Sequence, residues 1–144
     1  SSDLALEQQL AKYSAQWPDM TPEWFESRAW IWLHYAAVKL GRGELFEAIG
    51  MLSFFREQVL GPMLCRRANL PQRGVRRIEF HGIDPDGLLT STLATHDRDS
   101  VSMVIRRAVD AYINLRADAL PENIADDTAR RALLAMLKAY SERV

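Results

Sequence analysis

Hydrophobic residues recur at every third or fourth position along most of this chain, which is the spacing of amphipathic helices. Together with proline, glycine and capping residues, this pattern predicts about six helices. They cover residues 3–17, 22–40, 43–60 with an extension to 67, 85–95, 99–120 and 121–144. Residues 69–84 have no helical period, and we expect one short extended segment at 75–80.

The boundary between the second and third predicted helices indicates a helical hairpin. Thr21-Pro22 is a typical helix start, with a hydroxyl cap followed by proline at the first helical position. We expect Gly41 to end this helix in the left-handed conformation and Gly43 to cap the next one. Because only residues 41–43 separate the two helices, they should double back and pack antiparallel.

Composition places the chain among ordinary globular domains. Its 144 residues, 48% of them hydrophobic, suffice for one domain with its own core. The net charge of −1 gives no overall attraction to nucleic acid or anionic membranes, and no apolar run approaches the ~20 residues that cross a bilayer. A single cysteine, Cys65, excludes an internal disulfide and fits a cytoplasmic protein. We therefore predict an all-α, up-and-down bundle of about five to six helices with one irregular Arg-rich loop at residues 69–84.

The helix predicted at 22–40 carries a strip of aromatic and cationic side chains beside its apolar face. At roughly 100° per residue, this strip is about 60° wide. Two interpretations stand: long side chains that lie over apolar neighbours with their charges in water, or one face of a ligand-binding cleft. The members of the strip are Trp24, Arg28, Tyr35, Lys39 and Arg42.

The next predicted helix places Arg56 in the middle of its apolar arc. An unpaired buried guanidinium is costly, so Arg56 should either pair with a carboxylate in the bundle or face a ligand cavity. In the second case Arg56 and the strip line one cleft, whose cations and rings suit an anionic, ring-bearing ligand such as a nucleotide. Phe46, Met51 and Phe54 lie off the apolar arc, and we expect a two-fold dimer through them.

The irregular loop has the clearest charge asymmetry in the chain. Arginine forks bind phosphate or carboxylate bidentately, and Gly74 permits close approach of the backbone. The loop is therefore a candidate anion site, with a solvated loop against acidic helix ends as the alternative. No aromatic residue lies between the arginines, which disfavours single-stranded nucleic acid as a partner. The arginines of this region are Arg66, Arg67, Arg73, Arg76 and Arg77.

We recognise no catalytic or metal site in the sequence. Asp84-Pro85-Asp86 has proline between its acids, which is typical of a turn and a helix start. His96-Asp97 has too few further ligands for a metal, so Asp97 is expected to cap a helix. Cys65 is interpreted as a small buried residue.

Arg28 and His34 loosely match the spacing of a HEPN-like helical ribonuclease. They lie about 120° apart on one helix, which disfavours a joint active site.

Several stretches of the chain resemble one protein family. They are RAWIWLHYAAVKLGRGELFEAIGMLSFFREQVLGPMLCRR at 28–67, RGVRRIE at 73–79, LATHDRDSV at 93–101 and AVDAYINLR at 108–116. They are similar to the C-terminal helical domain of bacterial nucleotidyltransferase-like proteins of the kanamycin (aminoglycoside) nucleotidyltransferase type. In such proteins a small α/β domain with a Gly-Ser motif and paired acidic residues binds metal and nucleotide. The helical bundle that follows helps to bind the acceptor substrate and often builds a dimer.

The resemblance implies that residues 1–144 are a single non-catalytic domain for substrate binding and dimerisation, and that they form the C-terminal part of a longer protein. The first residue, Ser1, is not methionine, which we interpret in the same way. The N-terminal nucleotidyltransferase domain would be the partner, and nucleotide and magnesium are expected only with that domain, not as cofactors of this chain. Glu44 and Glu47 are the nearest candidates for a general base, with dipole-stabilised acids at a helix start as the alternative. A stand-alone helical module that binds a ligand or a partner is the other reading of the whole chain.

Overall fold

The computed structural model of the chain describes residues 3–8, 18–124 and 127–143, and the regular elements in these residues are helical. The all-α prediction is confirmed. Residues 3–8 are helical, and the rest of the helix expected at 3–17 lies outside the described residues. The other helices are α2 (Pro22–Gly41), α3 (Leu45–Phe55), α4 (Gly61–Arg67), α5 (Ile78–His81), α6 (Arg98–Arg116) and α7 (Thr128–Ser141), with a π-helical turn at Arg56–Leu60 and a 3₁₀ turn at Thr90–Thr92.

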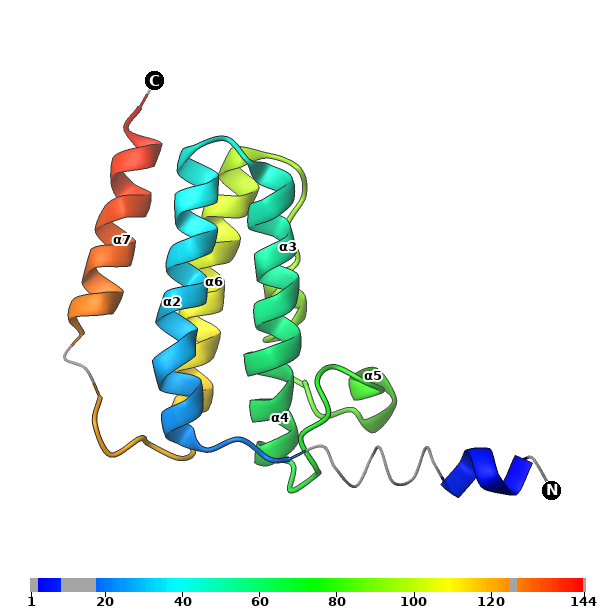
Figure 1. Cartoon of the computed structure of the whole chain (residues 1–144). Coiled ribbons are helices and arrows are strands. Elements are labelled where there is room, and N and C mark those ends of the chain that lie inside the picture. Colours follow the sequence, from blue (N-terminus) through cyan, green and yellow to red (C-terminus); the bar gives the residue numbers. More distant parts are fainter. Residues whose placement is uncertain (1–2, 9–17, 125–126, 144) are drawn as a thin grey trace.

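Long helices run side by side to form the bundle (Figure 1), with α2 packed against α3, α6 and α7. The short helix α5 projects from the α3–α4 side, across the bundle from α7. The segment 68–97 carries the chain back along the bundle, so that α6 runs in the same direction as α3 rather than opposite to it. Within the described ranges, no helix combines the length and apolar composition that crossing a membrane requires.

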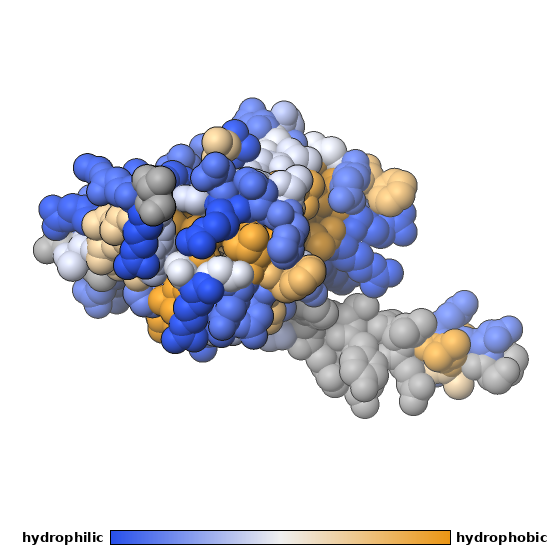
Figure 2. Space-filling model, turned by 90° about the horizontal axis from the view of Figure 1, so that it is seen from above, coloured by the Kyte–Doolittle hydropathy of each residue, from blue (hydrophilic) through white to orange (hydrophobic). Residues whose placement is uncertain are grey.

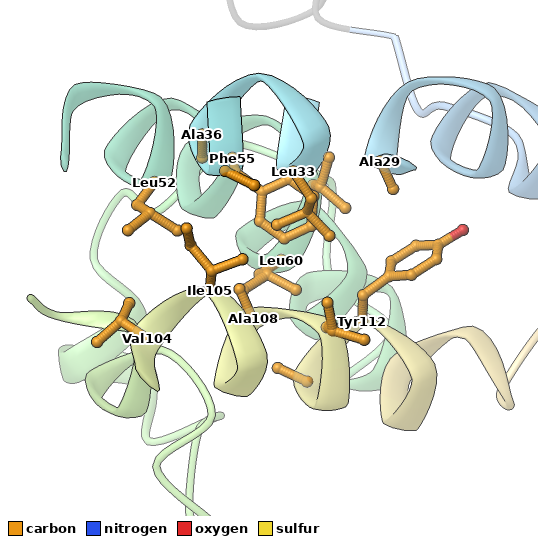
Figure 3. Close-up of a cluster of buried hydrophobic side chains, with 14 of the residues drawn as sticks. Ala29, Leu33, Ala36, Leu52, Phe55, Leu60, Val104, Ile105, Ala108 and Tyr112 are labelled. Atoms are coloured by element: carbon orange, nitrogen blue, oxygen red, sulfur yellow. The ribbon is translucent and has the colours of Figure 1, made fainter. Parts of the chain in front are cut away.

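Side chains from α2, α3 and α6 meet in one core. Leu33, Phe55, Ile105 and Tyr112 are almost completely buried, and Figure 3 shows them gathered between these helices. Burying a side chain of this size contributes about 1.5–3 kcal/mol. The apolar faces expected on the second and third helices are therefore the faces that build the core.

The hairpin of α2 and α3 forms as expected, but its turn residues play different roles. The Thr21 hydroxyl accepts the Trp24 N–H at 3.2 Å, which confirms the predicted cap. Gly41 does not end the helix in a left-handed conformation: it lies in the last turn of α2, and Gly43 adopts the positive φ of 76°. A Cβ at Gly41 would meet the ring of Tyr140 from α7, so Tyr140 packs directly over this glycine.

The predicted continuation of the third helix to Arg67 is also present. Between α3 and α4 the helix widens into the π-helical turn, where the Gly61 N–H donates to the Arg56 carbonyl. Pro62 follows at once and has no N–H to donate. The wider turn rearranges the hydrogen bonds before this proline, and the helix continues.

Two predictions for the segment between α4 and α6 are wrong. No helix covers 85–95, because the Asp84 carboxylate accepts the N–H groups of Leu88 and Leu89 at 2.7 and 2.9 Å and closes a turn. A single 3₁₀ turn at Thr90–Thr92 follows. The segment 75–80 is not extended either, since α5 starts there after Arg77 takes the left-handed conformation.

The last two helices are shorter than expected. Asp97 caps α6 as predicted and accepts the Ser100 N–H at 3.0 Å, but α6 ends at Arg116 instead of 120. The final helix begins at Thr128 and not at Pro121. Beyond Pro121, the Glu122 N–H binds the Glu23 carboxylate of α2 at 3.1 Å, so this stretch crosses the start of α2 as a loop.

Candidate functional site

Trp24 of the strip predicted on α2 begins a series of edge-to-face rings that runs through Trp32, which is not part of the strip, onto α3. Trp24 and Trp32 meet edge to face at 5.9 Å, and Trp32 meets Phe54 of α3 at 4.8 Å. The Arg28 guanidinium lies 4.4 Å from the centre of the Trp24 ring and donates to the Trp24 carbonyl. These contacts are typical of stable edge-to-face and cation–π pairs, so the side chains of this half of the strip hold one another in position.

The other half of the strip is built around Lys39. Its ammonium lies 2.9 Å from a Glu44 carboxylate oxygen and 2.7 Å from one of Glu47, and 5.3 Å from the Tyr35 ring centre. Hydrogen bonds to Glu47 and Glu44 hold the pKa of Lys39 above its usual value, and the bond from Lys39 lowers the pKa of Glu44. The two candidate general bases are thus paired with Lys39, while Arg42 is exposed at the end of the hairpin.

Arg56 belongs to a different set of contacts. Its Nε donates to the Thr92 hydroxyl at 2.9 Å and its Nη2 to the Thr92 carbonyl at 2.7 Å. Burial lowers the pKa of Arg56 from its ordinary value. Arg56 therefore binds no carboxylate among the described residues and faces no described hollow. Its two hydrogen bonds to Thr92 hold the 84–97 segment against the bundle. Ligand binding by Arg56 together with the strip stays a prediction, and none of the described hollows is lined by these residues.

A buried ionic network lies near the start of α2. Glu26, only 7% exposed, accepts hydrogen bonds from the Trp30 indole at 3.1 Å, from the Tyr112 hydroxyl and from Arg116, whose Nη1 is 3.1 Å from Oε1. Burial first, and then the bond to the Glu26 carboxylate, raise the pKa of Tyr112. Because one carboxylate serves three donors, this network joins α2 to α6 and acts as a structural support.

The sequence predictions did not include this network, although one signal of it is present: the position of Glu26 on the apolar face of its helix. Glu26 lies seven residues before Leu33, and residues seven apart share one helix face. The partners Tyr112 and Arg116 are 86 and 90 positions away, so no local pattern pairs them with Glu26.

A hollow of about 440 Å³ opens beside the network, lined by Glu23, Glu26, Ser27, Trp30, Asn123 and Ala129.

The Arg-rich loop folds around a second hollow, of about 240 Å³. Arg73, Arg76 and His81 line it together with Cys65, Leu70 and Pro71. Arg77 instead stacks on the exposed ring of Phe80, with its guanidinium carbon 5.3 Å from the ring centre. The structure therefore brings two of the three loop arginines to one site and adds a histidine that the sequence predictions left out.

The two arginines before the loop have structural partners. Arg67 pairs with Asp118 at 2.7 Å and also binds the Asn114 side chain and carbonyl. Arg66 donates to the Leu115 carbonyl at 3.0 Å, and two other nitrogens of its guanidinium are buried without a partner among the described residues. Both arginines thus bind the carbonyl end of α6, where cations are favourable.

The residues expected to form a dimer patch contact different neighbours. Phe46 is 82% exposed and leans on His96, whereas Phe54 is 42% exposed and packs on Trp32. Met51 is half-buried against the core. Seen from the end of the bundle (Figure 2), hydrophobic atoms appear as separate patches between hydrophilic ones. Dimer formation stays a prediction.

In the part of the chain that the structure describes, no three His, Cys, Asp or Glu side chains come together as a metal site. Asp84 is used in a turn, and Asp97 caps α6. Arg28 is engaged with Trp24 and Ser27, whereas His34 is exposed.

No protein-family model, curated protein or solved structure matches the chain.

Proposed function

We propose that this chain is the non-catalytic helical domain of a nucleotidyltransferase-like protein, in which it binds substrate and builds a dimer. The observation that carries the proposal is the exposed apolar surface of the α2–α3 hairpin. On α2, Ile31 is 66% exposed and Tyr35 41%, and on α3, Phe46 is 82% exposed and Phe54 42%. Large apolar side chains that are exposed on two neighbouring helices favour an interface with another protein surface.

The nature of the partner is taken from the sequence. Residues 28–67, which include most of α2 and all of α3, carry the longest stretch that resembles the C-terminal helical domain of that family. An N-terminal α/β domain and a second copy of the chain are the two surfaces such a hairpin would meet. In this proposal the α/β domain supplies nucleotide and magnesium.

The strip on α2 supplies the substrate side of the proposed cleft. Arg28 is held over Trp24, and Lys39 is held by Glu44 and Glu47. A nucleotide phosphate or another anion would compete with these two carboxylates for Lys39. The Glu44 and Glu47 side chains are 43% and 54% exposed, whereas that of Lys39 is only 15% exposed, so water can solvate the carboxylates that an anion displaces.

Sedimentation of the 144-residue chain over a concentration series tests the hairpin as an interface. We expect a concentration-dependent dimer, which the double variant Ile31→Glu/Phe54→Glu abolishes by placing charges in an apolar contact. Met103→Glu is the matched control, because Met103 is an exposed apolar residue of α6 outside the hairpin. A monomer at all concentrations, or a double variant that still dimerises, would reject this part.

The domain role is tested separately on the gene and its full product. The reading frame upstream of Ser1 should encode a Gly-Ser motif and a strand-borne acidic pair. The full product should transfer nucleotide with magnesium, whereas the 144-residue chain alone should not. An initiation codon directly before Ser1 would favour the stand-alone binding module, and turnover by the isolated chain would overturn the non-catalytic role.

A further inference from the structure

We infer that Arg73, Arg76 and His81 form a binding site for a phosphate monoester on the loop between α4 and α6. All three side chains line one open hollow of about 240 Å³. The site lies on the α3–α4 side of the bundle, where α5 projects (Figure 1). It does not depend on the dimer or on the proposed nucleotidyltransferase partner.

The loop is held in place on both sides of Arg73. On one side, the Gln72 side chain accepts the Met20 N–H at 2.8 Å, and the Gln72 N–H donates to Asp19 at 3.0 Å. On the other side, Gly74 lies against Gly61 of the bundle so closely that a Cβ on Gly61 would be 2.3 Å from the Gly74 carbonyl oxygen. A cationic site on such a fixed loop is preorganised, which lowers the entropy cost of binding.

The two arginines and the histidine of this hollow have no acidic partner among the described residues. Among the described residues no carboxylate lies within 4.0 Å of Arg73, Arg76 or His81, whereas Arg67 and Arg116 each have one and Lys39 has two. None of the lining residues is acidic. An anion can therefore bind two guanidinium groups and an imidazole without breaking an ion pair, and the guanidinium fork matches phosphate oxygens bidentately.

The volume and the lining of the hollow limit the class of ligand that it can bind. Its volume lies below the ~300–1,000 Å³ of pockets that enclose a whole drug-sized ligand. Cys65, Leu70 and Pro71 add an apolar part beside the cations. A phosphate attached to a sugar or nucleoside uses both parts, since the phosphate meets the arginines and the organic group covers the apolar surface.

Calorimetric titration of the 144-residue chain with ribose 5-phosphate, AMP and adenosine tests the site at low ionic strength, where exposed cations bind anions most strongly. We expect both phosphates to bind and adenosine not to bind. The double variant Arg73→Ala/Arg76→Ala should weaken phosphate binding about tenfold or more, because each charged hydrogen bond is lost. Tighter binding of AMP than of ribose 5-phosphate would identify a nucleotide as the source of the phosphate, and equal binding a sugar phosphate.

Arg131→Ala is the matched control, since Arg131 is an exposed arginine on α7 at the other side of the bundle. This variant should bind both phosphates with the affinity of the wild type. A second measurement needs no variant: addition of ribose 5-phosphate should shift the His81 ring resonances in the NMR spectrum, and those of His34 should stay in place. The inference fails if neither phosphate binds, if adenosine binds equally well, if the double variant keeps wild-type affinity, or if the His81 resonances do not move.

Discussion

Replacement of Glu26 by alanine should be among the most destabilising single changes in this protein. The variant removes the carboxylate that accepts hydrogen bonds from Trp30, Tyr112 and Arg116. The side chains of Glu26 and Arg116 are only 8% and 12% exposed, so water cannot take over these bonds. Removing one partner of a buried ion pair costs about 3–5 kcal/mol, because an uncompensated charge stays behind. We therefore expect the free energy of unfolding to fall by about that amount.

Urea unfolding followed by circular dichroism measures this loss. Asp110→Ala is the control, since Asp110 is an exposed acid on α6, the helix that also carries Arg116, and should change stability by less than about 0.5 kcal/mol. The double variant Glu26→Leu/Arg116→Met should recover most of the lost stability, because replacing both charges leaves none unpaired. A loss below about 1 kcal/mol for Glu26→Ala, or a double variant as unstable as the single one, would refute a desolvated ion pair.

Three further predictions use the same unfolding measurement. Because the folded pKa of Tyr112 is raised, the unfolded chain loses this proton first as pH rises past about 10, so wild-type stability should fall there and Tyr112→Phe should flatten the fall; equal slopes would contradict this. Gly61→Ala should destabilise by about 1–3 kcal/mol because the new Cβ meets the Gly74 backbone, whereas Gly50→Ala, whose Cβ meets open space, should stabilise by up to about 1 kcal/mol; the same sign for both would contradict the packing argument. Asp97→Ala should cost about 1 kcal/mol through loss of the α6 cap, and no loss would show that the cap is dispensable.

Local sequence signals predicted the α2–α3 hairpin well. Thr21 and Asp97 cap their helices as expected, because a cap depends on residues only two or three positions away. The apolar face of α2 is also the buried face, since helical periodicity decides which side chains share one side.

The same local signals failed where a turn competes with a helix. Asp84 followed by proline matches a helix start, but its carboxylate closes a short turn instead. Acid side chains can satisfy the backbone in either way. Gly41 likewise matches a helix stop, and only its contact with Tyr140 from α7 shows that it serves packing.

Local sequence signals likewise predicted some members of the candidate sites, and only the fold revealed the others. The sequence identified Arg73 and Arg76 as anion-binding candidates from charge alone, but their shared hollow with His81 exists only in the folded loop. The strip on α2 could be read from one helical wheel, whereas the partners of its cations, and of Arg56, could not.

The sequence by itself determined the all-helical class, the hairpin and the faces that become buried, because these follow from periodicity and from residues a few positions apart. Only the tertiary structure decided that Glu26 meets Arg116 across 90 positions, and that Gly61 seats the arginine loop. Contacts of that kind depend on how whole helices pack, and no local pattern specifies which distant side chain will neutralise a buried charge.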